Sequence, residues 1–271
     1  MALSNEAGES LQIHQLNCYS FHFGYPGITR CLLIETGESL VLVDSGVGLR
    51  DFTNPSLLFR GFFLSNRGDR NPDQAAIRQV IRLGYDPKDV RHIVQTHLHL
   101  DHAGGLRDFP WARVHVYRPE YAAATSRRKR RLLEYAYEPA HWSHGPDWVL
   151  YDTREGTWFD LPCARVLEDT GTQIRLVPLV GHTRGHCGVA ISTPGGWLLH
   201  AGDAYIRDMQ IDPIQPRSAF PRFAAPFERI MFPPQGRALL HALLGSHSHE
   251  VRVFCAHDPH SPINDLGIGL N

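Results

Sequence analysis

The chain has 271 residues, of which 42% are hydrophobic and 20% are charged, as in ordinary globular proteins. Its 27 Lys and Arg residues balance 28 Asp and Glu residues, and the net charge of −1 gives no reason to expect nucleic acid or an anionic membrane as a partner. No stretch approaches the roughly 18 continuous apolar residues of a membrane span. The N-terminus lacks the basic start and apolar stretch of a secretory signal. The five cysteines are scattered, which favours reduced thiols and a cytoplasmic location.

The first half of the chain is expected to form strands, a helix and a further strand. Apolar patterning predicts strands over residues 11–20, 29–35, 39–44 and 90–95, and the turn at Gly37 predicts a hairpin between the second and third. A helix is predicted from Asn71 to about Leu83, because apolar residues recur there at helical spacing. This order of elements indicates a layered α/β domain.

Residues 51–72 mix Phe and Leu with Asn, Gly and Pro, a composition that predicts a loop covering an apolar cleft.

Asp44 ends a predicted strand. Its carboxylate either faces a functional site or accepts a hydrogen bond from its own turn, and the sequence leaves both interpretations open.

A cluster of metal-binding residue types follows the strand at 90–95. His97, His99, Asp101 and His102 lie within six positions, and glycines come directly after them. Side chains two positions apart share a side of an extended chain, so His97 and His99 can face one ion while Asp101 and His102 face another. Imidazole and carboxylate suit zinc and similar divalent ions, which makes this segment a candidate metal site.

The middle of the chain is less regular. Residues 113–117 are predicted as a strand and residues 119–137 as a helix. The basic run Arg127–Arg131 is interpreted as a solvated helix face, with an anion or nucleic-acid contact as the alternative. Residues 138–159 are rich in Trp, Tyr and Phe and are interpreted as an insertion that either forms a substrate wall or packs in the core.

The second half supplies further candidate ligands at strand ends. Strands are predicted over residues 174–180, 187–192, 197–200 and 251–256, the middle two forming a hairpin. His182, Asp203 and His257 each follow one of these strands, where the loops of an α/β sheet gather. His186 and His200 lie beside these ligands, and either support them or have purely structural roles.

This set of motifs resembles the metallo-β-lactamase-fold hydrolase superfamily. The resemblance rests on His97-x-His99-x-Asp101-His102, Gly181-His182-Thr183, Gly202-Asp203, Ala256-His257-Asp258 and the early Asp44-Ser45-Gly46, and it spans residues 11 to 258. It implies an α/β fold, a four-layer αβ/βα sandwich with mixed sheets. We therefore expect a single domain over residues 1–271 with an insertion at about 118–160.

The resemblance also implies a dinuclear centre. His97, His99 and His182 would hold one metal ion, Asp101, His102 and His257 would hold the second, and Asp203 would bridge them. Zinc is the expected metal, with manganese, iron and cobalt as alternatives, because the order of metal affinities is generic. A hydroxide between the ions would attack the substrate, since bound divalent ions lower the pKa of water to about 7. Asp101 would orient it and accept its proton, and Tyr205 would stabilise an oxyanion.

Within the superfamily, the N-acyl homoserine lactonase-like group resembles this chain best. Asp203 argues against true β-lactamases, which usually lack aspartate at that position. Mononuclear iron persulfide dioxygenases share the first motif and remain an alternative, as do thioester and phosphodiester hydrolases. The tyrosine of the lactonase group lies three positions after the aspartate, whereas Tyr205 lies two after it. A metal-binding regulator or an inactive scaffold would be expected to lack one of the seven ligands.

The expected function is therefore the opening of a lactone or related ester. The apolar residues Phe59, Phe62, Phe63 and Leu64 would suit an acyl chain. The expected partner is a small-molecule substrate, with neither nucleic acid nor membrane, and exposed aromatic residues would permit a homodimer.

Overall fold

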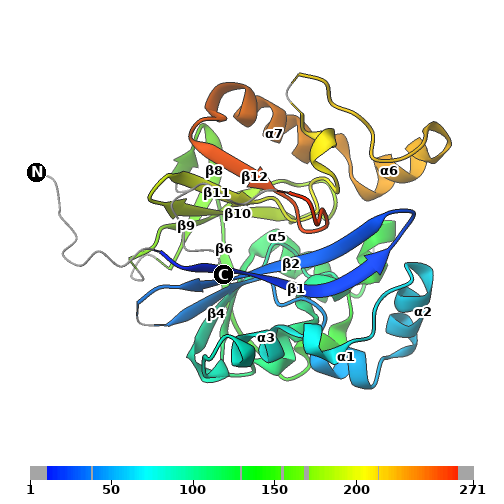
Figure 1. The fold of residues 1–271 in the computed structure, drawn as a ribbon, viewed down its shortest axis with the longest axis vertical. Helices are drawn as coiled ribbons and strands as arrows, with labels where there is room; N and C mark the ends of the chain where they lie inside the picture. The colour runs from blue at the N-terminus through cyan, green and yellow to red at the C-terminus, as the bar shows by residue number, and fades with distance from the viewer. Residues whose placement is uncertain are drawn as a thin grey trace, which may run out of the picture.

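A computed structural model describes residues 11–37, 39–128, 130–153, 156–167, 171–212 and 214–261. Two six-stranded sheets lie face to face, and helices cover their outer sides (Figure 1). The first sheet has the order β1 (Ile13–His22), β2 (Pro26–Glu35), β3 (Leu40–Val43), β4 (Val90–Val94), β5 (Arg113–Tyr117) and β6 (Asp147–Tyr151). The second has the order β12 (Val251–Phe254), β11 (Gly196–His200), β10 (Cys187–Thr193), β9 (Ile174–Pro178), β8 (Leu161–Val166) and β7 (Gly156–Trp158).

Both sheets are mixed. Strands β1 to β3 pair antiparallel and β3 to β6 pair parallel. In the second sheet β7 to β11 pair antiparallel, whereas β11 and β12 are parallel. The predicted hairpins around Gly37 and between β10 and β11 are confirmed.

Helices form the outer layers. The α-helices are α1 (Leu49–Thr53), α2 (Leu57–Ser65), α3 (Ala76–Arg82), α4 (Leu100–Ala103), α5 (Arg118–Thr125), α6 (Ala225–Met231) and α7 (Pro234–His247). Short 3-10 helices are η1 (Pro72–Gln74), η2 (Pro87–Asp89), η3 (Gly104–Asp108), η4 (Leu132–Ala136), η5 (Pro139–Trp142), η7 (Asp208–Gln210) and η8 (Arg222–Ala224). In Figure 1, α1 to α3 lie on the outer side of the first sheet and α6 and α7 beyond the second.

The hydrophobic cores follow these layers. One core lies between the sheets and joins residues of the first, such as Leu32 and Val94, to residues of the second, such as Leu176 and Phe254. A second core packs the other face of the first sheet against α3, and a third packs the second sheet against α7. Helix on sheet on sheet on helix is the predicted four-layer αβ/βα sandwich, which is confirmed.

The prediction of a loop over residues 51–72 is wrong, because α1 and α2 occupy most of it. Ser56 is the N-cap of α2, because its side chain accepts a hydrogen bond from the backbone N–H of Phe59. The Gly and Pro residues of this segment are typical of loops and do not indicate this cap. Phe59 and Phe63 are one helical turn apart, and both are buried against Tyr19 and Phe52. The prediction that this segment covers an apolar cleft agrees with the position of Phe62, which lines a mostly apolar cavity.

The predicted helix over residues 119–137 is also wrong beyond Thr125. α5 ends there, Ser126 is extended, and the next regular element is η4. The run Arg127–Arg131, in which Lys129 lies outside the described residues, is therefore not a helix face. Consecutive like charges repel one another and offer no apolar side chain to bury, so nothing stabilises a helix there. The helix predicted from Asn71 is interrupted at Ala75, whose backbone is extended between η1 and α3.

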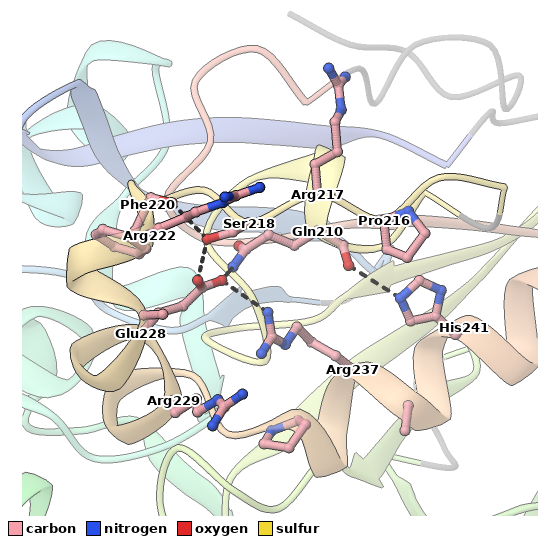
Figure 2. A pocket seen from close by; sticks show the side chains of 13 residues that line it. Gln210, Pro216, Arg217, Ser218, Phe220, Arg222, Glu228, Arg229, Arg237 and His241 are labelled. Carbon is pink, nitrogen blue, oxygen red and sulfur yellow. Dashed lines mark hydrogen bonds and ion pairs between the residues drawn. The ribbon is translucent and has the colours of Figure 1, made fainter.

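A buried carboxylate anchors the segment that leads into α6. Glu228 accepts hydrogen bonds from Gln210, Ser218 and Arg237, and so joins the 208–220 segment to α6 and α7 (Figure 2). These groups line a cavity of about 470 Å³ beside α6. Because Glu228 already has three donors, it serves to hold this wall of the molecule in place.

Some expectations concern parts of the chain that the structure leaves untested. Residues 1–10, for which no secretory signal is expected, lie outside the described residues. Residues 118–160 contribute β6 to the first sheet and β7 to the second, and the interpretation of this segment as an insertion in a single domain stays a prediction. Within the described ranges, no helix combines the length and apolarity needed to cross a membrane.

The core between the sheets yields a stability prediction. Leu32→Ala is expected to lower the free energy of unfolding by about 2–5 kcal/mol, because Leu32 is fully buried and truncation leaves a cavity. Leu57→Ala is the matched control, since Leu57 is 85% exposed, and it should change stability by less than about 0.5 kcal/mol. Urea unfolding measures both. Equal effects of the two substitutions would contradict the assignment of the core.

Candidate metal centre

The candidate ligands converge at one edge of the two sheets. His97 and His99 follow β4, and Asp101 and His102 lie in α4 directly after them. His182 follows β9, Asp203 follows β11 and His257 follows β12. The chain thus brings together side chains that are up to 160 positions apart, from His97 to His257. All seven residues are at most 9% exposed.

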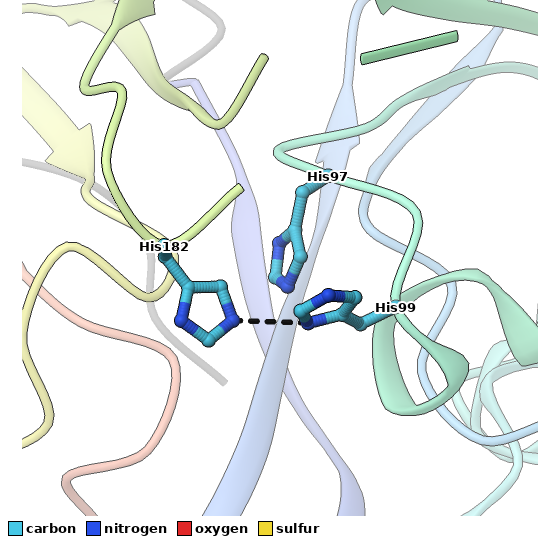
Figure 3. A group of neighbouring side chains, drawn as sticks. All are labelled: His97, His99 and His182. Atoms are coloured by element: carbon cyan, nitrogen blue, oxygen red, sulfur yellow. Dashed lines mark hydrogen bonds between the residues drawn. The ribbon is translucent and has the colours of Figure 1, made fainter. Parts of the chain in front are cut away.

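These side chains form three overlapping groups able to hold metal ions. The ligand atoms within each group lie within 4.8 Å of one another, and the groups are His97, His99 and His182; His97, His102 and Asp203; and Asp101, His102 and His257. Figure 3 shows the first group, in which His182 Nε2 and His99 Nδ1 are 2.9 Å apart. Asp203 lies between the groups: Oδ2 is 3.3 Å from His182 Nε2 and 3.1 Å from His257 Nε2. Its Oδ1 is 3.3 Å from His102 Nε2.

The outer ring nitrogens are held by the surrounding protein. Nδ1 of His102 donates to Asp44, Nδ1 of His182 to the carbonyl of Met231, and Nδ1 of His257 to the carbonyl of Ile28. Nε2 of each ring then faces the cluster, within 3.3 Å of Asp203. Hydrogen bonds of this kind fix the orientation of metal-binding imidazoles.

Buried polar atoms that lack hydrogen-bond partners indicate whether metal ions fit between these side chains. Nε2 of His97, His99 and His102 and Oδ1 of Asp203 are buried and have no hydrogen-bond partner. Buried polar atoms normally have partners, so four such atoms in one cluster are the pattern of a donor set for cations. Imidazole nitrogens and carboxylate oxygens are ligands of zinc and related divalent ions, and the residues fit such ions.

The pKa shifts of these side chains agree with a site for metal ions. Burial holds the pKa of His97, His99 and His182 below its ordinary value, so these imidazoles are neutral. Burial also lowers the pKa of His102 and His257, but nearby carboxylates, Asp203 first, outweigh it and raise both pKa values. The pKa of Asp203 would rise through burial, but His257, His102 and His182 hold it well below its usual range.

Asp44 supports the segment that carries the candidate ligands from His97 to His102, which answers the question that its sequence position left open. It is fully buried, and its carboxylate accepts from the backbone N–H and the hydroxyl of Thr96 and from His102 Nδ1, each at 2.8 Å. Asp44 adopts a left-handed backbone conformation with φ 55°, which Asp tolerates better than most residues. It is a positioning residue for His102.

His186 and His200 both support the loop that carries Asp203. Burial lowers the pKa of His186 to about 3, so the neutral ring donates from Nδ1 to the carbonyl of Leu179 and accepts at Nε2 from the backbone N–H of Asp203. His200 accepts from the N–H of Gly202 and donates to the carbonyl of Arg30. Gly202 has φ +52°, and a Cβ there would lie 2.6 Å from His186 Nε2, so only glycine fits.

Glu120 is a buried organiser that sequence reasoning missed. Its carboxylate accepts from the N–H of Leu98, the hydroxyls of Tyr137 and Thr183, and the N–H of Gly185. It therefore joins the loop that carries His97 and His99 to the loop that carries His182. No motif or spacing in the sequence indicates this role, because its partners are as many as 65 positions away.

The structure does not bring Tyr205 into this arrangement. Its side chain is fully buried in the core beside α7, and its hydroxyl donates to Asp208 at 3.3 Å. It is not among the described residues that line the cavity beside the candidate ligands. The predicted oxyanion role of Tyr205 has no support in this geometry, and we do not carry it into the proposal below.

A mostly apolar cavity of about 390 Å³ opens beside the cluster. Five candidate ligands line it, together with Ser65, Asn66 and the apolar side chains Phe21, Phe23, Phe62, Leu100, Leu133, Ala136, Ile206, Phe220, Phe227, Met231 and Phe232. Phe232 stacks on the ring of His182, with centroids 5.8 Å apart, and Phe21 packs against His257 at 5.4 Å. A small apolar molecule in this cavity would contact the candidate metal centre directly.

Comparisons with known proteins agree with this geometry. The family model of the metallo-beta-lactamase superfamily matches residues 24–228, a range that contains every candidate ligand except His257. A probable metallo-hydrolase of Mycobacterium tuberculosis is 35% identical over 265 residues, which cover 93% of this chain and 82% of that protein. An N-acyl homoserine lactonase of Bacillus thuringiensis is 31% identical over 185 residues, which cover 66% of this chain and 64% of that protein.

A solved structure shares the fold. It is an N-acyl homoserine lactone hydrolase with the product N-hexanoyl-L-homoserine bound at its catalytic metal centre, and the superposition has a TM-score of 0.65 at 20% identity. It covers 93% of this chain and 94% of that chain.

The role of Asp44 can be tested through metal affinity. Asp44→Asn is expected to weaken metal binding by about 10- to 100-fold, because His102 loses its charged acceptor. Asp86→Asn is a matched control, since Asp86 only accepts from the N–H of Lys88 at an exposed 3-10 turn. Competition with a chromophoric chelator measures both affinities. An Asp44→Asn protein that binds metal as tightly as the unchanged chain would refute the positioning role.

Metal binding is also expected to depend on pH. The raised pKa values of His102 and His257 mean that these rings hold protons that an incoming cation must displace, so affinity should fall as pH is lowered. Calorimetric titration at pH 7 in two buffers of different ionisation enthalpy should reveal net proton release. Binding without proton release would show that the cation does not bind to these two rings.

Proposed function

We propose that this chain, which belongs to the metallo-beta-lactamase superfamily and is a metal-dependent hydrolase, opens a lactone or a closely related small ester. The observation that carries the proposal is the apolar cavity built directly against the candidate ligands. Among the described residues that line it there is no Lys or Arg, which favours a neutral substrate over a phosphodiester or an anionic thioester. The lactonase named above and the lactone hydrolase of the same fold support the same substrate class.

The proposed centre holds two divalent ions. His97, His99 and His182 would bind one, Asp101, His102 and His257 the other, and Asp203 would bridge them, in agreement with the three groups of ligand atoms. Zinc is the proposed metal, because borderline nitrogen and oxygen ligands suit it, and manganese, iron and cobalt are the alternatives to test. When bound, such ions polarise an ester carbonyl and lower the pKa of water so that hydroxide forms near neutral pH.

Asp101 is the proposed proton carrier. It lines the cavity, and its Oδ2 accepts a hydrogen bond from the hydroxyl of Thr29 at 3.3 Å, which fixes the carboxylate. Asp101 would accept the proton of the attacking water and return it to the alkoxide oxygen released when the ester bond breaks. Lactone plus water then gives one hydroxy acid, and no separate leaving group has to depart.

The apolar walls bind the remainder of the substrate. Ring contacts lead from His182 to Phe232, from Phe232 to Phe220 and from Phe220 to Phe227, with centroids 5.8, 6.3 and 5.8 Å apart. Burial of an alkyl or acyl chain against these rings stabilises the complex by about 0.8 kcal/mol per CH₂ group. The same walls exclude bulk water from the reacting ester. The predicted homodimer and cytoplasmic location stay predictions.

A substrate panel tests the proposal. Zinc-loaded protein should hydrolyse short- and long-chain acyl homoserine lactones or a simple δ-lactone faster than an aryl ester, S-lactoylglutathione, a cephalosporin or bis-(p-nitrophenyl) phosphate. Acid release at constant pH measures all of them. Preferential cleavage of the thioester or phosphodiester would overturn the lactone proposal.

Asp101→Asn tests the chemistry separately from the fold. At saturating metal its kcat for lactones is expected to fall by about 10²- to 10⁴-fold, because the amide cannot accept a proton. Metal content by elemental analysis and the thermal unfolding midpoint accompany the kinetics, and Asp86→Asn is again the control. Full turnover by Asp101→Asn protein with bound metal would exclude the proposed proton transfer.

A further inference from the structure

The cavity has one hydrogen-bond donor that the proposed chemistry does not use. Apart from the candidate ligands, the only polar side chains among the described residues that line it are Ser65 and Asn66. The Ser65 hydroxyl already donates to the carbonyl of Phe62 at 2.9 Å, one helical turn earlier. The Asn66 amide is therefore the donor that a substrate meets in an otherwise apolar wall.

Asn66 is held firmly. Its side chain is 7% exposed, and its Oδ1 accepts a hydrogen bond of 2.6 Å from the Tyr19 hydroxyl. Its backbone N–H donates to Phe62 at the end of α2, and its carbonyl accepts from His22. In the described part of the chain, Nδ2 of Asn66 has no hydrogen-bond partner. Because Oδ1 is fixed on Tyr19, Nδ2 has a fixed direction as well.

The surroundings of Tyr19 fix its hydroxyl as the hydrogen-bond donor to Asn66 Oδ1. It is fully buried, and burial raises the pKa of its hydroxyl, which therefore keeps its proton and acts as a donor. The rings of Phe21, Phe62 and Phe63 surround it, with centroids 5.7, 5.3 and 5.6 Å from its own. Gly68 leaves room for the hydroxyl, since a Cβ at that position would lie 1.6 Å from Tyr19 Oη.

We propose that Asn66 Nδ2 donates a hydrogen bond to a carbonyl oxygen of the substrate that is not the scissile one. This inference rests on the proposed function, in which the bound ions polarise the scissile carbonyl and leave Asn66 for a second acceptor. The preferred substrate is then a lactone or ester that carries an amide or ketone carbonyl beside the reacting bond. A bound substrate removes this donor from water, so a substrate that leaves it unpaired binds less well, and Asn66 acts as a specificity-determining residue.

Two lactones that differ only in the second carbonyl test the proposal. One is N-hexanoyl homoserine lactone and the other a γ-butyrolactone with an α-alkyl chain of equal length and no amide. Asn66→Asp keeps the shape of the side chain but removes the donor, and Asn66→Leu removes all polarity. Each is expected to lower kcat/KM for the amide-bearing lactone about 10-fold or more, mainly through KM, and to change it less than about 2-fold for the alkyl lactone.

Further variants separate positioning from folding. Tyr19→Phe frees the amide to rotate, so it should lower the preference for the amide-bearing lactone by less than the Asn66 variants do. Ser143→Ala should leave the hydrolysis of both lactones unchanged, because its exposed hydroxyl donates to the carbonyl of Ala140 and Ser143 does not line the cavity. Calorimetric binding of the amide-bearing lactone to Asp101→Asn protein, with and without Asn66→Asp, gives a readout that does not depend on turnover. Thermal unfolding identifies any variant that fails to fold.

The outcomes distinguish the two proposals. Failure of the unchanged, zinc-loaded chain to hydrolyse either lactone overturns the proposed function, and this inference falls with it. If both lactones are hydrolysed and the Asn66 variants slow them equally, Asn66 acts on the scissile carbonyl or on the fold, and the inference is wrong while the function stands. Unchanged kinetics in both Asn66 variants overturn it as well.

Discussion

The carboxylate of Asp203, enclosed among imidazoles from both halves of the fold, is the interaction on which the rest of the structure depends. Removing a carboxylate from water costs several kcal/mol unless partners replace the lost hydration. Here the partners are His102, His182 and His257, all within 3.3 Å. His102 belongs to the first half, and the other two follow strands of the second. The candidate metal centre therefore forms only when the two sheets keep a fixed position relative to each other. The hydrophobic core between the sheets maintains that position.

Buried polar residues around the candidate metal centre hold its side chains and the two sheets in place. Asp44 fixes His102 in the first half, and His186 and His200 fix the Gly202–Asp203 turn in the second. Glu120 joins the two halves, because it accepts hydrogen bonds from Leu98 on one side and from Thr183 and Gly185 on the other. Each of these buried groups has its hydrogen bonds satisfied within the protein. Within the cluster, Nε2 of His97, His99 and His102 and Oδ1 of Asp203 lack such partners among the described residues, and cations can satisfy them.

The sequence predicts the features whose signals are local. A continuous run of Leu and Val residues indicates β3, and the close spacing of His97, His99, Asp101 and His102 indicates a candidate metal site. His182, Asp203 and His257 are predicted as ligands from their places after strands and from the family motifs that contain them. Features that depend on distant partners could not be predicted: Glu120 bonds to Thr183 across 63 positions, and Tyr19 bonds to Asn66 across 47. The oxyanion role of Tyr205 stays a prediction, since its place two residues after Asp203 does not determine the direction of its side chain, whose hydroxyl donates to Asp208.

The walls of the cavity and the candidate metal centre are physically connected. The candidate ligands follow strand ends or lie in α4, whereas the apolar lining of the cavity comes from β1, α2, α4, η4, α6 and the loops beside them. α6 ends at Met231, whose carbonyl accepts the hydrogen bond from His182 Nδ1, and the ring of the next residue, Phe232, stacks on His182. Glu228, in the same helix, anchors the segment that contributes Phe220 to the wall. A substitution that shifts the end of α6 is therefore expected to move the ring of the candidate ligand His182 as well, which couples the shape of the cavity to the candidate metal centre.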